Sequence, residues 1–426
     1  MGDSLLQRFI YSFVLYSLLP FIALRLCYRQ RWRERFALKR FKVLEQAQAV
    51  IVLHVVSVGE AMAARPLVEQ LLKAYPDHCI WLTSTTPTGS ATVQRLFGER
   101  VAHSYLPYDL PGAVARFLEQ LQPCLFLIME TELWPNLYEG CARRQIPLML
   151  VNARLSTRSV RGYQRVAGLV KQTLQAVQFI AAREQQDALH FQQLGALAER
   201  IQVCGNIKFD LNFPEQALQQ AQAWRQQWGT RPVWVAASTH AGEDEQLLKV
   251  HTQLRQRWPD LLLILVPRHP ERFNAVAALC AAESLTLVRR SQQATPQPTE
   301  QTAVLLGDSM GELQSWYATA DMAFIGGSLV DVGGHNPLEA ALCGVPTLTG
   351  PYQHNFVDIY PPLIAAGGAV QVESASDLVD HLAAWLADPL ARQAAGQAAR
   401  QFMLAQQGVV ARLMRPIQQL INYNVD

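Results

Sequence analysis

The sequence predicts an α/β protein with two domains, each built on a parallel sheet, behind an N-terminal membrane-anchor helix. Short apolar runs alternate with helical patterns along most of the chain, as expected of strands buried on both faces by crossover helices. The chain has 426 residues, too many for a single core, and half of them are apolar. The net charge of +2 gives no global basic field, so we expect no nucleic-acid partner.

Residues 1–42 are interpreted as a membrane anchor with a basic juxtamembrane segment. The stretch 9–24 carries no charge, and with its flanks it approaches the roughly 17–25 residues of a spanning helix. Most charges follow the apolar stretch, unlike those of a cleaved signal peptide, and the positive-inside rule then keeps the rest of the chain in the cytoplasm. Aromatic and basic residues interleave after it, which suits anionic lipid: Arg25, Tyr28, Arg29, Arg31, Trp32, Arg33, Arg35, Phe36, Lys39, Arg40, Phe41 and Lys42. The alternative is a buried core helix with a solvated basic neighbour.

The first α/β domain is expected over residues 43–210. Its predicted strands are 50–56, 79–82, 125–129, 147–151 and 179–182, and polar residues follow most of them. Because active groups of open α/β sheets gather beyond the carboxyl ends of strands, Glu60, Glu130 and Glu132 are candidates for a general base with a raised pKa. The alternative for each is an N-terminal helix charge. Lys208 stands near the exit of this domain and is either a site residue or a solvated surface lysine.

The second domain is expected over residues 232–400, after a linker at 211–231. Its predicted strands are 233–237, 261–266, 303–306, 322–325 and 345–348. Arg268 and His269 follow the second of these and are candidates to grip a phosphate. Ser309, Met310 and Gly311 follow the third and offer backbone N–H groups and a soft surface for a base.

A glycine-rich loop follows the strand 322–325. It runs through Gly326-Gly327 and Gly333-Gly334 to Asn336-Pro337, which predict an N-cap and a first helical residue. Glycines let the backbone approach a phosphate, a helix N-terminus attracts anions, and Glu339 can accept from a sugar hydroxyl. A nucleotide phosphate is the predicted ligand; the alternative is a tightly packed strand-to-helix turn.

Several known sites have no motif here. The chain holds neither Gly-x-x-x-x-Gly-Lys-Ser/Thr nor Gly-x-Gly-x-x-Gly, the fingerprints of P-loop and dinucleotide enzymes. Without an Asp-x-Asp pair, arginine, lysine and helix N-termini must neutralise the phosphate. The sequence therefore predicts no cofactor and metal-independent chemistry. Seven scattered cysteines without Cys-x-x-Cys predict a reducing compartment and neither a disulfide framework nor a zinc site.

The motifs as a set resemble those of the 3-deoxy-D-manno-octulosonic acid (Kdo) transferases of lipopolysaccharide synthesis, which are GT-B glycosyltransferases of family 30. The resemblance runs from the anchor to the final helices. It is carried by Ser57-Val-Gly-Glu60, Glu130-Thr-Glu-Leu-Trp-Pro-Asn136, Asn152-Ala-Arg-Leu-Ser156, Lys208-Phe-Asp210, Pro267-Arg-His-Pro-Glu-Arg-Phe273, Gly307-Asp-Ser-Met-Gly-Glu-Leu313 and Gly326-Gly-Ser-Leu-Val with Gly333-Gly-His-Asn-Pro-Leu-Glu339.

The resemblance implies a GT-B fold of two Rossmann-like domains facing a cleft, with a C-terminal helix over 401–426 returning to the N-terminal domain. It implies transfer of Kdo from CMP-Kdo to the lipid A precursor at the cytoplasmic face of the inner membrane, with inversion. Glu60 matches the general base, and Glu130 and Lys208 match positions that support the transition state. Arg268, His269, Ser309, Met310, Gly311, His335, Asn336, Pro337 and Leu338 match the CMP-contacting segments.

Two alternatives stay open. The first is another GT-B transferase or a nucleotide-sugar epimerase, which would bind a different nucleotide, such as a uridine one. The second is a membrane-attached sensor or scaffold that binds CMP-sugar without turnover. The acceptor's acyl pattern and the number of Kdo residues added do not follow from the sequence.

Overall fold

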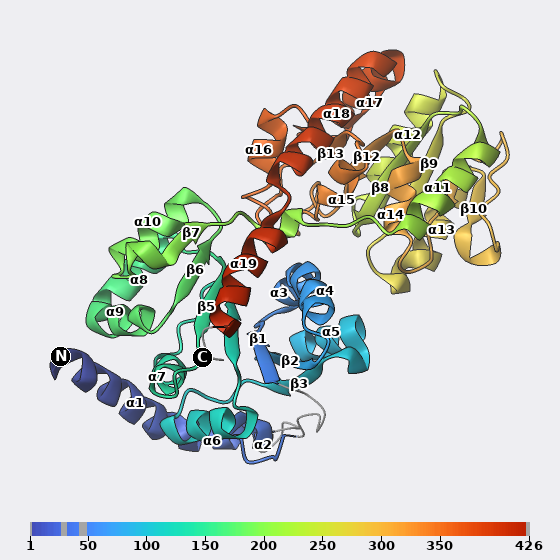
Figure 1. The fold of residues 1–426 in the computed structure, drawn as a ribbon. Coiled ribbons are helices and arrows are strands. Elements are labelled where there is room, and N and C mark those ends of the chain that lie inside the picture. The colour runs from blue at the N-terminus through green and yellow to red at the C-terminus, as the bar shows by residue number, and fades with distance from the viewer. Residues whose placement is uncertain (1, 27–31, 42–48, 423–426) are drawn as a thin grey trace. The chain divides into compact units, whose positions relative to one another are not determined.

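The computed structural model describes residues 2–26, 32–41 and 49–422. The chain divides into two compact units (Figure 1). Unit 1 comprises residues 1–210 and 408–426, and unit 2 comprises residues 211–407. The predicted division near residue 210 therefore coincides with the boundary between the units, whereas the predicted boundary at 42–43 lies outside the described residues.

Unit 1 is built on a parallel sheet that has seven strands in the described part of the chain, in the order β3-β2-β1-β4-β5-β6-β7. The strands are β1 (Ala49–His54), β2 (His78–Ser84), β3 (Ala102–Tyr105), β4 (Leu125–Met129), β5 (Leu148–Ala153), β6 (Phe179–Ala182) and β7 (Ile201–Val203). The central strands are buried on both faces, which is why their sequences are continuous apolar runs.

Helices cover both faces of this sheet and enclose two cores. One core includes residues of α6 (Pro111–Leu121), α7 (Pro135–Arg143), α8 (Thr157–Tyr163), α9 (Ala167–Gln175) and α10 (Gln185–Gln193). The other includes residues of α3 (Val58–Ala63), α4 (Arg65–Ala74), α5 (Pro87–Phe97) and the C-terminal helix α19 (Val409–Asn422). Figure 1 shows α19, in red, within unit 1, so the final helix returns to the first domain.

The N-terminal segment forms α1 (Gly2–Leu26) and α2 (Trp32–Arg35). No helix among the described residues is both long and apolar enough to cross a membrane. Within unit 1, α1 packs along α7 and α9.

Residues 32–41 differ from the predicted lipid-facing stretch because several of their side chains enter unit 1. Ala37 is buried in its core, and Phe41 contacts Trp81 and Phe117 edge-on. Phe36 contacts Tyr108 in the same way. Of the other basic and aromatic residues in that prediction, Tyr28, Arg29, Arg31 and Lys42 lie outside the described residues, as do the side chains of Arg25 and Trp32.

Unit 2 repeats the plan with a parallel sheet of seven strands among the residues described, in the order β10-β11-β9-β8-β12-β13-β14. These are β8 (Val233–Thr239), β9 (Leu262–Pro267), β10 (Leu287–Arg289), β11 (Val304–Leu306), β12 (Met322–Ile325), β13 (Thr347–Thr349) and β14 (Ala369–Gln371). The helices are α11 (Glu215–Trp228), α12 (Asp244–Arg255), α13 (Phe273–Ala282), α14 (Leu313–Thr319), α15 (Leu338–Leu342), α16 (Tyr360–Ala365), α17 (Ala375–Ala387) and α18 (Pro389–Gln406).

Two segments differ from the predicted domain limits. The stretch 211–231, predicted as linker, contains α11, whose Trp224 and Trp228 are buried in a core of unit 2. Trp224 stacks on Trp316 with ring centroids 4.3 Å apart. The chain re-enters unit 1 at Gly408 rather than at 401, because α18 continues to Gln406.

Candidate active site

Glu60 lies in the first turn of α3, directly beyond the carboxyl end of β1. Ser57 is the N-cap of this helix and accepts from the Glu60 N–H, as in a capping box, but the Glu60 carboxylate accepts from the Val56 N–H and the Ser57 hydroxyl and not from the N-cap N–H. The Val56 N–H donates to Glu60 Oε2 at 2.9 Å, Ser57 Oγ donates to Glu60 Oε1 at 3.2 Å, and the Glu60 N–H donates to Ser57 Oγ at 3.3 Å. These contacts fix the carboxylate.

The pKa of Glu60 is raised from 4.5 to about 7. Burial is the main cause, the charges of Glu130 and Glu132 act in the same direction, and the hydrogen bonds from Val56 and Ser57 oppose the rise. Burial, with the charge of Glu130, also raises the pKa of Glu132. The structure thus brings the three glutamates of the predicted rim within electrostatic reach of one another. A carboxyl group that titrates near pH 7 is suited to accept a proton at neutral pH.

Two residues at the same rim have left-handed backbone conformations. Glu130 follows β4 with φ 53°, and Asn152 in β5 has φ 54°. Such conformations are costly for residues with side chains and gather at functional sites. The Asn152 Oδ1 accepts from the Ile207 N–H at 3.0 Å, so the segment that carries Lys208 is tied to the end of β5.

In unit 2 the parallel sheet brings four loops to one edge. They follow β11, β9, β8 and β12, which are consecutive neighbours in the sheet, and parallel strands end at the same edge. The β9 loop carries Arg268 and His269, and both side chains are exposed. The β12 loop carries His335, whose Nε2 lies 2.8 Å from His240 Nε2 in the β8 loop.

The histidines form a cluster with Arg268. The His240 ring contacts the His269 ring edge-on with centroids 5.3 Å apart. Burial, with the charges of His240, Arg268 and His269, lowers the pKa of His335 to about 4. His335 is therefore neutral at pH 7, and in the hydrogen bond to His240 one Nε2 donates while the other accepts.

A buried carboxylate, Glu243, fixes these loops. Its Oε2 accepts from the N–H groups of His240 at 2.9 Å and Gly327 at 2.7 Å. Its Oε1 accepts from those of Ser328 and Leu329, both at 3.0 Å. The side chain of one glutamate thus joins the loop after β8 to the loop after β12.

The glycine-rich loop differs in detail from its prediction. Gly327, Gly333 and Gly334 have φ of 68°, 100° and 75°, values that favour glycine. The helix α15 begins at Leu338, so Pro337 and not Asn336 occupies the N-cap position. The Asn336 side chain still satisfies the first helical N–H, because its Oδ1 accepts from the Leu338 N–H at 3.1 Å. The helix has only five residues, so its dipole is weaker than the sequence suggested.

Two further candidates have protein partners. Glu339, predicted to bind a sugar hydroxyl, accepts from Gln314 Nε2 at 3.1 Å. The Ser309 hydroxyl is hydrogen-bonded to Glu312, which is ion-paired with Arg290 at 2.7 Å. Met310 next to it is 68% exposed, and Gly311 has φ 88°. The loop after β11 is thus held from its ends and presents its middle to solvent.

Both halves of the chain match models of known families. Residues 30–211 match the model described as 3-deoxy-D-manno-octulosonic-acid transferase (kdotransferase), and residues 231–402 match that of glycosyl transferases group 1. The chain is 42% identical over 400 residues to the 3-deoxy-D-manno-octulosonic acid transferase of Haemophilus influenzae, with 93% of each chain covered. It belongs to the Kdo transferase family.

Other comparisons agree on the family and the fold. The Bordetella pertussis 3-deoxy-D-manno-octulosonic acid transferase is 37% identical, covering 96% of this chain and 98% of its own. The crystal structure of UDP-GlcNAc 2-epimerase from Neisseria meningitidis covers 87% of this Kdo transferase and 100% of its own chain with a TM-score of 0.58. At 12% identity that likeness shows the GT-B-like fold alone.

Two residues of this Kdo transferase stand out that the sequence analysis did not select. His240 lies in the loop after β8, and Glu243 is the N-cap residue of α12. Their place beyond the strand 233–237 is the one signal in the sequence, and it does not distinguish them from their neighbours. The role of Glu243 follows from the structure, where the buried carboxylate requires hydrogen-bond donors around it. Among the described residues, no group of three or more His, Cys, Asp or Glu side chains is arranged to hold a metal ion; metal independence stays a prediction. Six cysteines are free thiols, and Cys27 lies outside the described residues.

Proposed function

We propose that this Kdo transferase moves Kdo from CMP-Kdo to a hydroxyl of the lipid A precursor in lipopolysaccharide core synthesis, with inversion and without a metal ion. The family membership supports the transfer of Kdo. The observation that carries the mechanism is the carboxylate of Glu60, fixed by two donors and with a pKa near 7.

In the proposed step Glu60 takes the proton of the acceptor hydroxyl, and the hydroxyl oxygen forms a bond to the anomeric carbon of Kdo. The bond from that carbon to the CMP phosphate breaks, and CMP leaves with the electron pair. A direct displacement of this kind inverts the anomeric centre. A carboxylate with a pKa near 7 is a stronger base than an ordinary glutamate and still ionises at neutral pH.

The donor is assigned to the loop edge of unit 2. The leaving phosphate gains negative charge as the bond breaks, and a guanidinium placed there stabilises that charge. Arg268 is the exposed arginine beside the histidine cluster and is the residue we assign to the phosphate. When the Nε2 of neutral His335 accepts from His240, the ring carries its proton on Nδ1, and that N–H is a donor for the phosphate. The short α15 contributes less than the arginine.

Lys208 and Glu130 are assigned supporting roles. Lys208 is held near the end of β5 through its neighbour Ile207, and Glu130 acts on Glu60 through its charge. An ammonium group at this rim would offset the negative charge of the substrate carboxylate or phosphate.

We also propose that α1 attaches the protein to the cytoplasmic face of the inner membrane by lying in the interface. One side of the helix packs on unit 1, whereas the opposite side exposes large apolar side chains. They are Leu6, Phe9, Ile10, Phe13, Val14, Tyr16 and Leu18, each 45–69% exposed. A helix with one apolar face toward solvent is typical of interfacial attachment.

The decisive experiment is to incubate the full chain with CMP-Kdo and a tetra-acylated lipid A precursor and to determine the mass of the product. Addition of Kdo is expected. CMP binding without any product would support the non-catalytic alternative, and turnover of a uridine nucleotide sugar in its place would support another GT-B enzyme.

A further inference from the structure

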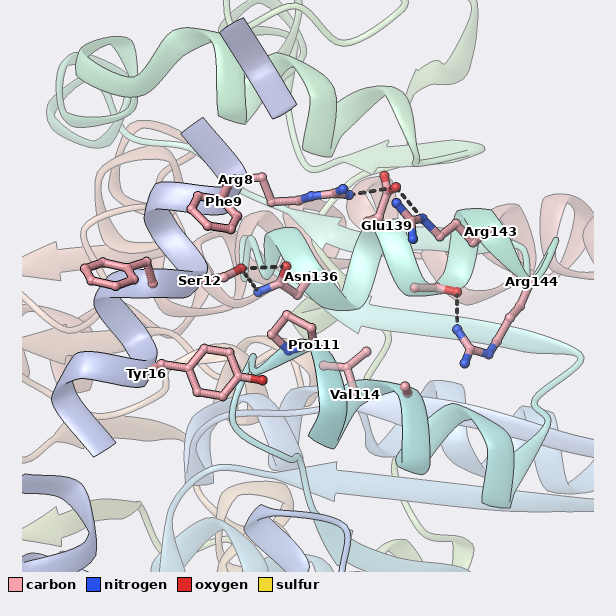
Figure 2. A pocket seen from close by; sticks show the side chains of 13 residues that line it. Arg8, Phe9, Ser12, Tyr16, Pro111, Val114, Asn136, Glu139, Arg143 and Arg144 are labelled. Carbon is pink, nitrogen blue, oxygen red and sulfur yellow. Dashed lines mark hydrogen bonds and ion pairs between the residues drawn. The ribbon is translucent and has the colours of Figure 1, made fainter. Parts of the chain in front are cut away.

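A pocket of about 640 Å³ lies on unit 1 where α1 crosses α6 and α7 (Figure 2). The volume falls in the range of small-molecule sites, roughly 300–1,000 Å³. It is formed on the opposite face of the sheet from α3, the helix that carries Glu60. The proposed chemistry therefore does not use it.

The wall that α1 contributes is fixed by polar contacts. Ser12 Oγ and the Asn136 side chain are hydrogen-bonded at 3.1–3.2 Å. Asp109 accepts from the N–H groups of Asn136 at 2.9 Å and Leu137 at 2.8 Å, and its side chain also takes the hydrogen bond of Tyr11. Asp109 is 4% exposed. Burial raises its pKa to about 6, and it joins α1 to the first turn of α7.

The pocket has an excess of positive charge. Its lining includes three arginines, Arg8, Arg143 and Arg144, and one acidic residue, Glu139. Arg8 and Arg143 both bind Glu139, each at 2.7 Å (Figure 2). Burial acts to raise the pKa of Glu139, but these hydrogen bonds outweigh it and hold the pKa below its usual value. Glu139 is thus ionised at neutral pH, and two positive charges remain uncompensated within the lining.

The wall that α1 contributes also carries apolar side chains, and these continue onto the exposed face of the helix. Phe9, Phe13 and Tyr16 line the pocket, and they are also 69%, 64% and 47% exposed. A ligand held here meets guanidinium groups at one end and aromatic side chains that lead out of the pocket at the other. That combination matches an anionic head group attached to acyl chains.

We propose that this pocket binds the head group of an anionic glycerophospholipid, with the phosphodiester at Arg143 and Arg144 and the acyl chains along Phe9 and Phe13. The volume accommodates a head group and the first chain carbons but not a whole lipid. The proposal rests on the interfacial placement of α1. Burial of apolar side chains alone would not distinguish lipids by the charge of their head groups. The pocket would add selectivity for an anionic head group.

The test is a lipid titration of the full chain in a non-ionic detergent, followed by native mass spectrometry, with phosphatidylglycerol and phosphatidylcholine as probes. Phosphatidylglycerol should bind more tightly. The double variant Arg143→Gln/Arg144→Gln should weaken it by roughly tenfold or more, since each arginine near an anionic lipid is worth about fivefold, and should leave phosphatidylcholine unchanged. Phe13→Ser should weaken both lipids, because it removes chain contact.

The matched control is Lys73→Gln/Arg95→Gln, which removes two charges from exposed positions on α4 and α5, on the other face of the sheet. An equal loss in this control would mean that net charge alone attracts the lipid, and the pocket would be refuted. If free sn-glycerol 3-phosphate at the same concentration displaced phosphatidylglycerol, the pocket would be a simple anion site and not a lipid site. A higher KM for the acceptor with unchanged phosphatidylglycerol binding would reassign the pocket to the acceptor.

The lipid titration itself needs neither a bilayer nor turnover; only the comparison of acceptor KM values does. If the full chain failed to bind vesicles yet retained phosphatidylglycerol in detergent, the interfacial placement of α1 would fail while the pocket stood. Absence of Kdo transfer would likewise leave the lipid titration interpretable.

Discussion

Replacing Glu60 by glutamine tests whether this residue acts as the general base or has only a structural role. The amide keeps the size of the side chain, and its oxygen can still accept from the Val56 N–H, which donates to Glu60 at 2.9 Å. Turnover should fall by roughly 10²–10⁴-fold, the contribution of a positioned general base. CMP affinity should not change, because Glu60 is assigned to the acceptor hydroxyl and is not among the groups assigned to CMP.

The variant should also be more stable than the parent at neutral and alkaline pH. Burial raises the pKa of Glu60 from 4.5 to about 7, so the unfolded chain ionises first and the free energy of unfolding falls as the pH rises between these values. The full difference corresponds to at most about 3 kcal/mol at roughly 1.4 kcal/mol per pKa unit. Partial solvation of the carboxylate reduces that figure. Glutamine carries no such cost, so the stabilisation should be present above pH 7 and absent near pH 4.

Melting temperature, CMP affinity and single-turnover rate, measured on one preparation at pH 5, 7 and 8.5, provide the test. In the parent enzyme the rate should rise with pH and level off above about 7, and the variant should lack this rise. A variant that melts lower at every pH, or that turns over at nearly the parent rate, would refute the reasoning and direct the search to Glu130 or Glu132.

Three further outcomes are expected. Arg268→Ala should weaken CMP binding by about 1.5–3 kcal/mol, the range for hydrogen bonds to charged groups; unchanged calorimetric affinity would remove Arg268 from the site. Glu243→Gln replaces one acceptor oxygen by an NH₂ group that faces backbone N–H donors, so it should lower the free energy of unfolding by roughly 2–4 kcal/mol and weaken CMP binding. The control Glu245→Gln, at an exposed neighbouring position, should change neither quantity. Equal effects of the two variants in urea unfolding would contradict the role of Glu243. Chelator should leave turnover unchanged, and inhibition that magnesium reverses would overturn the metal-free mechanism.

The strands that the sequence predicted are the central ones of both sheets. Runs such as 125–129 and 322–325 coincide with β4 and β12, because strands buried on both faces are continuously apolar. The strands without a prediction are β3, β7, β10 and β14, the edges of the two sheets. They have only three or four residues and are partly exposed, so they carry no comparable apolar run.

The candidate site was predictable where residue type and strand position coincide. Glu60, Glu130 and Arg268 each follow a recognisable strand. His240 and Glu243 could not be selected in this way. Their roles depend on distant partners, Gly327 for Glu243 and His335 for His240, which lie 84 and 95 residues away in the chain. The docking of α1 on unit 1 was not predictable either. Its polar residues Tyr11 and Ser12 gain a role only through Asp109 and Asn136, which the one-dimensional pattern of an apolar stretch does not reveal.

The docking of α1 has a consequence for synthesis of the chain. Its hydrogen-bond partner Asn136 is 124 residues further along, and at roughly 5–20 residues per second a ribosome needs about 6–25 s to make that stretch. Throughout this interval the nascent helix is undocked, and both its apolar side chains and its polar ones are available to other surfaces. Under the proposed interfacial attachment, the polypeptide would have time to meet a bilayer before unit 1 exists as a folded body, and unit 1 would then fold with its first helix already held at the lipid surface.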